Sequence, residues 1–103
     1  MIDATLTRDN ILEVLRNNSI TIRDSFKVRR IGLFGSSVRD EMTLDSDIDM
    51  LVEFDKNTFD NYMELKAYLE NLFNREVDLV LSDSLKPRLR QYVQREVVYA
   101  EGL

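Results

Sequence analysis

Apolar residues recur at helical spacing in four stretches of this chain, and three of those stretches follow a polar residue that can cap a helix. In the first stretch Ile11 and Leu15 are four positions apart, Thr7 can cap the helix, and the pattern ends at about Asn17. The second stretch is short and contains β-branched residues, which weaken helices. The predicted helices are 8–17, 20–27, 58–74 and 85–100.

The two later helices have clear apolar faces. The third, which Asn57 or Thr58 can cap, carries an apolar stripe along one side and is expected to pack on a sheet. The last is expected to follow a cap at residues 82–84, with Pro87 tolerated in its first turn. Its buried face is predicted to comprise Leu85, Leu89, Tyr92, Val93, Val97 and Ala100.

Three shorter runs rich in β-branched and other apolar residues, 28–34, 49–54 and 76–81, predict strands. In the third run the apolar residues of one face alternate with Asp78 and Val80, so the other face carries a carboxylate. The connection between the first two strands is short. The resulting order of elements predicts an α/β (α+β) fold, a small mixed β-sheet flanked by helices.

Composition narrows the functional classes. With 103 residues the chain is expected to form one domain, residues 1–103, with a modest core. A formal charge of −5 disfavours nucleic acid as a partner. Cysteine and histidine are absent, which excludes disulfides, the usual zinc sites and histidine-based catalysis. The chain has no long apolar run and no signal sequence, so we expect a cytoplasmic protein without a membrane partner.

Negative charge is concentrated between residues 40 and 60, where eight acidic residues stand against Lys56 alone. Like charges on neighbouring strand and loop positions repel one another unless solvent, salt or bound cations offset them. A divalent metal ion is a natural offset, and its ligands would have to be carboxylates.

One stretch combines such carboxylates with a glycine turn. Gly35 and Ser36 end the first predicted strand, where glycine lets the backbone approach a phosphate and the hydroxyl and following N–H groups can donate to it. Asp47 and Asp49 are two positions apart, so their carboxylates can converge on one ion. If the third strand lies next to the second, Asp78 joins them. Three carboxylates beside this turn suit magnesium and nucleotidyl transfer.

These residues also carry a resemblance. Gly35-Ser36, ten intervening residues, Asp47-x-Asp49 and the later acid Asp78 resemble the signature of the nucleotidyltransferase superfamily related to DNA polymerase beta. The short length resembles the minimal nucleotidyltransferases, the MntA-type antitoxins encoded beside HEPN ribonuclease toxins. With its flanking residues, the resemblance extends over about residues 28–100.

The resemblance implies a compact nucleotidyltransferase core with ATP as the donor and Mg2+ as the cofactor. It implies a protein adenylyltransferase that transfers AMP to a tyrosine hydroxyl of a partner HEPN toxin, with which it can form a hetero-oligomer. By the same resemblance, Gly35 and Ser36 contact the phosphates, Asp47 and Asp49 hold the metal, and Asp78 serves as metal ligand and general base.

Two residues beside the turn leave alternatives open. Arg39 either contacts a phosphate of ATP or pairs on the surface with Asp40 or Glu41. Asp40 stands where the family usually has glycine, which adds a negative charge near the triphosphate and favours an antitoxin that neutralises its toxin by binding alone. Transfer to a small-molecule acceptor is a third alternative, and it would need dimerisation to supply an acceptor pocket.

Overall fold

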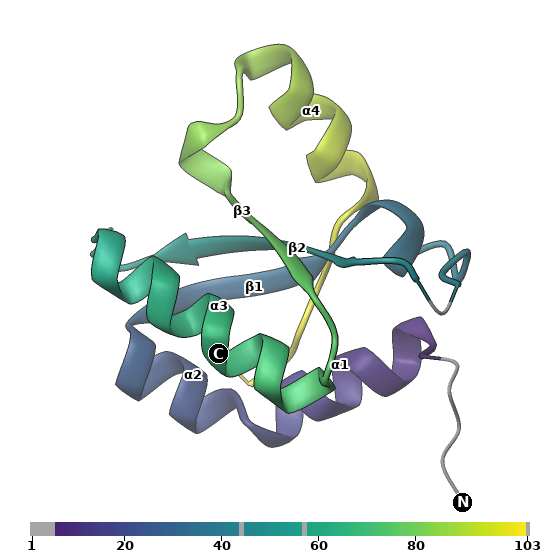
Figure 1. Cartoon of the computed structure of the whole chain (residues 1–103). Helices are drawn as coiled ribbons and strands as arrows, with labels where there is room; N and C mark the ends of the chain where they lie inside the picture. The colour runs from purple at the N-terminus through teal and green to yellow at the C-terminus, as the bar shows by residue number, and fades with distance from the viewer. Residues whose placement is uncertain (1–5, 44, 57, 103) are drawn as a thin grey trace, which may run out of the picture.

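The computed structural model describes residues 6–43, 45–56 and 58–102, which form helices, strands and two short 3-10 turns (Figure 1). The helices are α1 (Arg8–Asn17), α2 (Ser19–Phe26), α3 (Phe59–Phe73) and α4 (Pro87–Glu96). The strands are β1 (Val28–Leu33), β2 (Ile48–Phe54), β3 (Val77–Leu81) and β4 (Val98–Tyr99). The 3-10 turns are η1 (Gly35–Ser37) and η2 (Ser82–Ser84).

The strands form one mixed sheet in the order β3-β2-β1-β4. β1 and β2 are antiparallel, with Leu33 opposite Met50, whereas β2 and β3 run parallel, with Met50 opposite Leu79. A parallel pair needs a crossover connection, and α3 provides it between β2 and β3. The mixed sheet flanked by helices is therefore confirmed.

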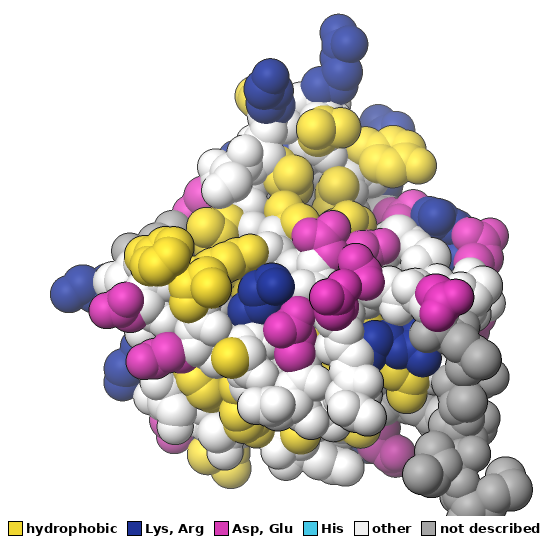
Figure 2. All heavy atoms as spheres, viewed as in Figure 1, with side chains coloured by type: hydrophobic (Ala, Val, Ile, Leu, Met, Phe, Trp, Pro, Cys, Tyr) yellow, Lys and Arg dark blue, Asp and Glu magenta, His cyan; other side chains and the backbone are white. Residues whose placement is uncertain are grey.

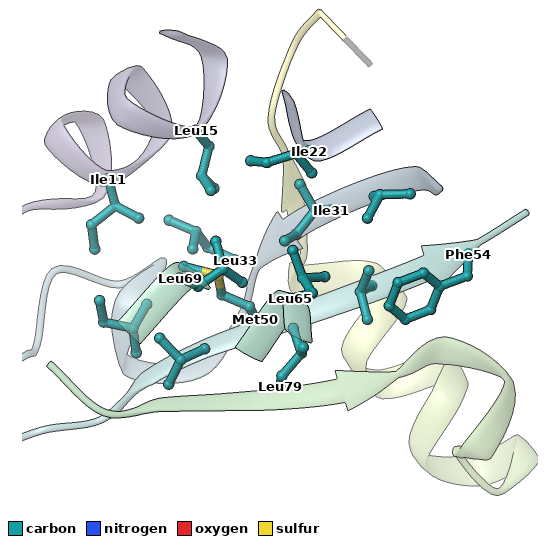
Figure 3. Close-up of a cluster of buried hydrophobic side chains, with 14 of the residues drawn as sticks. Ile11, Leu15, Ile22, Ile31, Leu33, Met50, Phe54, Leu65, Leu69 and Leu79 are labelled. Carbon is teal, nitrogen blue, oxygen red and sulfur yellow. The ribbon is translucent and has the colours of Figure 1, made fainter. Parts of the chain in front are cut away.

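The core lies between the sheet and the three helices α1, α2 and α3, while α4 stands beyond the other face of the sheet (Figure 1). Side chains from both layers meet in this core (Figure 3), including Ile11 of α1, Met50 of β2 and Leu65 of α3, which are fully buried. Because neighbouring residues of a strand point to opposite faces, Asp49 of β2 and Asp78 of β3 lie on the face that these three helices leave uncovered.

The first and third helices begin as their sequences predict. The Thr7 side chain accepts a hydrogen bond from the Asn10 N–H at 3.2 Å, and the Thr58 side chain accepts one from the Asn61 N–H at 3.0 Å. The alternative cap, Asn57, lies outside the described residues. Among the described residues, no helix has the length and apolarity that crossing a membrane requires.

The prediction for the last helix is wrong at both ends. Residues 82–84 form η2 instead of a cap, and α4 begins only after Lys86, whose side chain makes no capping hydrogen bond. The helix ends at Glu96, and its predicted apolar face is only partly buried: Val93 is buried as predicted, whereas Leu89 is 53% exposed and Tyr92 is 64% exposed. Pro87 explains the start, because proline suits the first position of a helix and disfavours helical geometry in the residue before it.

The strand β4 replaces the end of the predicted helix. Val98 and Tyr99 have high strand propensity, and they pair with Leu33 and Gly32 at the free edge of β1. Gly32 permits this close approach, since a Cβ built there would lie 2.7 Å from the Val98 carbonyl oxygen. The edge pairing outweighs the helical spacing of the apolar residues, which sequence periodicity alone could not reveal.

Candidate active site

The turn after β1 brings the backbone close to a carboxylate of β2. Gly35 has a φ of +65°, and a Cβ built on it would lie 2.5 Å from Oδ2 of Asp49. The Gly35 carbonyl accepts hydrogen bonds from the backbone N–H groups of Val38 and Arg39, at 3.2 and 3.3 Å. Glycine is therefore required here twice, by its left-handed backbone and by the space that Asp49 occupies.

The same turn holds the backbone at the start of β2. The Asp49 N–H donates to Oγ of Ser37 at 2.9 Å, and the Phe34 N–H donates to the Asp49 carbonyl at 3.2 Å. Ser37 is fully buried. Sequence reasoning assigned no role to Ser37, although it directly follows the Gly35-Ser36 pair. Its hydroxyl fixes the position from which the Asp49 side chain projects.

The structure places two of the predicted acids, Asp49 and Asp78, next to each other, and Asp47 nearby. Asp49 and Asp78 are register partners on the parallel strands β2 and β3, so their side chains lie side by side on one face of the sheet. Asp47 is the residue immediately before β2. It is exposed, and so is Asp78. Figure 2 shows acidic side chains gathered on the face of the molecule below α4.

The electrostatics of Asp49 reflect this crowding. Partial burial raises the pKa of Asp49 above its ordinary value of 3.8, and the negative charges of Asp78 and Asp47 raise it further. A hydrogen bond from the Ser36 backbone N–H and the positive charge of Arg39 act in the opposite direction and lower the pKa. The net shift is upward, so the site favours any species that adds positive charge.

The three carboxylates do not form a ready-made metal cage. Among the described residues, no set of three acidic side chains is close enough together to hold a metal ion. Magnesium in phosphate-transfer sites usually takes one or two carboxylates and completes its octahedral shell with water and substrate phosphate oxygens. The paired Asp49 and Asp78 and the nearby Asp47 fit that mode, because oxygen ligands and net negative charge are both present.

Arg39 lies at this site with two carboxylate partners. Its Nε donates to Oε1 of Glu41 at 2.8 Å, as the surface-pairing prediction has it, and its Nη1 donates to Oε2 of Glu96 at 2.9 Å. The other oxygen of Glu96 accepts a hydrogen bond from the Gly35 N–H. Sequence reasoning missed Glu96, because it is 61 residues from Gly35 and stands in a helix without a local motif.

Asp40 is directed away from the turn that was expected to bind phosphate. Its Oδ1 accepts a hydrogen bond from the backbone N–H of Arg8 at 2.7 Å, at the N-terminus of α1. Its φ of +56° lies in the left-handed region, which explains why glycine suits the position and why aspartate, which tolerates that region better than most residues, can replace it. The carboxylate therefore has a structural partner at the start of α1.

Apolar side chains flank the acidic face (Figure 2). An open groove of about 350 Å³ is lined by Thr58, Phe59, Tyr62 and Leu81 at one side. On α4, Leu89 and Tyr92 are exposed. Surface clusters of large apolar side chains beside a polar site are typical of faces that contact another protein.

Most of the chain matches a known protein family. The profile of the family described as "Nucleotidyltransferase domain" matches residues 18–100. Protein adenylyltransferase MntA of Thermococcus cleftensis is 44% identical to this chain over 97 residues, which cover 93% of this chain and 98% of that protein.

Two solved structures resemble the fold. A structure described as a minimal nucleotidyltransferase has a TM-score of 0.78 and 33% identity, and the match covers 93% of this chain and 98% of that chain. A complex of a tri-AMPylated Shewanella oneidensis HEPN toxin with an MNT antitoxin contains a chain with a TM-score of 0.62 and 25% identity. That match covers 89% of this chain and 73% of the other.

Proposed function

Since this chain belongs to the nucleotidyltransferase domain family and is a nucleotidyltransferase, we propose that it is an antitoxin that transfers AMP from Mg-ATP to a tyrosine hydroxyl of a partner HEPN ribonuclease toxin. The observation that carries the proposal is the pairing of Asp49 with Asp78 across β2 and β3, beside the Gly35 turn. The AMP-modified toxin in the related complex supports the choice of acceptor.

The residues have the following roles in this proposal. The backbone at Gly35 and Ser36, with the guanidinium of Arg39, binds the phosphates of ATP. Asp47, Asp49 and Asp78 would hold magnesium, which when bound would supply positive charge to neutralise the triphosphate and polarise the α-phosphate. Asp49 and Asp78 lie on the sheet face opposite the core, where a large acceptor can approach.

The chemistry is one displacement at the α-phosphorus. The tyrosine oxygen forms a bond to the α-phosphorus, the bond from that phosphorus to the oxygen bridging to the β-phosphate breaks, and pyrophosphate leaves. Asp78 accepts the proton of the attacking hydroxyl. Its exposure suits a base that must reach a group on another protein, whereas the half-buried Asp49 is better suited to remaining with the metal.

A protein acceptor explains the surface around the acids. Residues 1–103 act in this proposal as one minimal nucleotidyltransferase domain, and the acceptor hydroxyl arrives on a second protein. Phe59 and Tyr92, exposed at 77% and 64%, would be covered in such a complex. The reaction takes place in the cytoplasm, where ATP and the RNA substrates of a ribonuclease toxin are found.

The experiment is intact-mass spectrometry of a HEPN toxin mixed with this chain, magnesium and ATP. The toxin is the one encoded beside this chain's gene or, failing that, the Shewanella oneidensis HEPN toxin of the related complex. We expect its mass to increase by one or more AMP groups, each mapped by fragmentation to a tyrosine. The inactive control is the double variant Asp47→Asn with Asp49→Asn, and Asp45→Asn is the matched control for a change of charge in the same loop.

The outcomes separate the proposal from its alternatives. Loss of the mass increase in the double variant, with the Asp45→Asn protein still active, supports catalysis by these acids. A double variant that modifies the toxin as well as the wild type does would contradict it. Neutralisation of the ribonuclease without ATP and without any mass change would indicate an antitoxin that acts by binding alone.

A further inference from the structure

The last residue of α4 reaches the turn after β1. One oxygen of the Glu96 carboxylate accepts a hydrogen bond from the Gly35 N–H, and the other accepts one from Nη1 of Arg39 at 2.9 Å. A single side chain thus contacts both the backbone turn and Arg39, the cation that binds the phosphates in the proposed function. The Glu96 side chain is 19% exposed, and its hydrogen bond from the Gly35 N–H is partly shielded from solvent.

From this geometry we propose that Glu96 is a positioning residue for nucleotide binding, which holds the Gly35 turn and the Arg39 guanidinium in the arrangement that receives the phosphates of ATP. This inference rests on the proposed function and adds a residue to its site. Glu96 acts through its two partners and does not itself contact the nucleotide.

The hydrogen-bonding capacity of Arg39 supports this role. A guanidinium has five N–H donors. Glu41 takes one at Nε and Glu96 takes one at Nη1, which leaves three donors to face an anion. The Glu96 carboxylate restricts the orientation of this planar group, whereas the Glu41 carboxylate is 60% exposed and its ion pair contributes little. Arg39 remains 45% exposed, so a phosphate can reach it.

Arg39 is also held within reach of the acidic pair. Arg39 shares the Glu96 carboxylate with Gly35, and a Cβ built on Gly35 would lie 2.5 Å from Oδ2 of Asp49, so the guanidinium is held on the side of the turn that Asp49 contacts. A phosphate bound by Arg39 would therefore stand near the carboxylates assigned to the metal. The contact from Glu96 keeps the cation there.

The position of Glu96 is itself fixed by the sheet. Glu96 is followed after one residue by β4, in which Val98 pairs with Leu33. Leu33 stands two residues before Gly35, so the strand pairing and the Glu96 contact hold the same end of β1. Residues 96–99 thereby hold the turn in place, although α4 stands away from the main core (Figure 1).

The test measures binding of a fluorescent, non-hydrolysable ATP analogue with magnesium to the full chain. The variants are Glu96→Ala, which removes both contacts, and Glu96→Gln, whose single amide oxygen can replace only one of the two carboxylate oxygens and places an N–H₂ group against the other partner. The matched control is Glu41→Gln, which neutralises the other partner of Arg39 and leaves the turn untouched. Circular dichroism and thermal unfolding of each variant establish that it is folded.

We expect Glu96→Ala to weaken analogue binding about tenfold, because charge-assisted hydrogen bonds are lost from both partners. Glu96→Gln should lie between Glu96→Ala and the wild type, and Glu41→Gln should change the affinity less than about threefold. In an Arg39→Ala background the effect of Glu96→Ala should shrink, since one of its two partners is already absent.

The results that overturn the inference are distinct from those that overturn the proposed function. If Glu96→Ala binds the analogue as tightly as the wild type does, or more tightly, Glu96 does not position the site, and tighter binding would identify its carboxylate as a competitor of the phosphates. If Glu96→Ala fails to fold, Glu96→Gln decides by the same comparison. A folded wild-type protein that does not bind the analogue would overturn the proposed function and this inference with it.

Discussion

At the scale of single residues, the site depends on one glycine and the carboxylate above it. Gly35 could be assigned from the sequence because it ends a predicted strand and precedes Ser36. The sequence could not indicate that a side chain at this position would collide with Asp49. It also could not indicate that Ser37 fixes the Asp49 backbone, because that bond depends on how the loop returns to β2.

The pairing of Asp49 with Asp78 predicts a measurable pKa change. Because the negative charge of Asp78 disfavours ionisation of Asp49, the substitution Asp78→Asn should lower the pKa of Asp49 toward its ordinary value of 3.8. Titration of the side-chain carboxyl carbons by NMR without divalent cations measures it. Asp45→Asn, which removes a charge that does not act on Asp49, should leave that pKa unchanged.

An Asp49 pKa that stays the same in Asp78→Asn would mean that the two carboxylates are farther apart in solution than their register implies. That result would also weaken the case for a shared magnesium ion.

At the scale of elements, sequence periodicity predicted helix or strand correctly where neighbouring residues in the sequence determine the structure. Thr7 and Thr58 cap the helices that they precede, and the runs 28–34 and 49–54 match the two central strands to within one residue at each end. It failed for residues 97–100, where apolar spacing favoured helix. There Val98 and Tyr99 pair with the free edge of β1. Local periodicity does not indicate a pairing between residues so far apart in the sequence.

The junction between α3 and β3 depends on one carboxylate. Oε2 of Glu70 accepts a hydrogen bond from the Val77 N–H at 3.0 Å and lies 3.3 Å from Nζ of Lys66. The backbone bond is the main cause that lowers the pKa of Glu70 below its ordinary value of 4.5, and the Lys66 contact adds to it. This bond joins the end of a helix to the first residue of a buried strand.

The lowered pKa predicts how stability depends on pH. An acid whose pKa is lower in the folded state stabilises the fold while it is ionised, and that contribution disappears as the pH falls through the folded-state pKa. The free energy of unfolding of the wild type should therefore exceed that of Glu70→Gln by less than about 1 kcal/mol at neutral pH, since the pair is partly exposed. The difference should narrow as the pH falls below the ordinary value of 4.5.

Urea unfolding at several pH values measures this difference. Glu64→Gln, which neutralises an exposed acid on the same helix, is the control and should show no such narrowing. A gap between wild type and Glu70→Gln that is constant from neutral pH to below 4.5 would show that the Val77 contact does not depend on the charge.

At the scale of the whole molecule, three helices cover one face of the sheet and leave the other to the site (Figure 1). The sequence indicated that Asp47, Asp49 and Asp78 could meet, on the condition that the second and third predicted strands were neighbours. The parallel pairing of β2 and β3 meets that condition. The contact from Glu96 to Gly35 could not be foreseen, because the two residues are 61 positions apart in the sequence and meet only in the folded protein.

Transfer of AMP to the partner toxin is the central step of the proposed function. The most direct measurement incubates the chain and its HEPN partner with ATP labelled either at the α-phosphate or at the γ-phosphate. We predict that the toxin acquires label from the α-phosphate alone, and only with magnesium and intact Asp47 and Asp49. Label acquired from the γ-phosphate, or label from the α-phosphate that persists in the double Asn variant, would contradict the account.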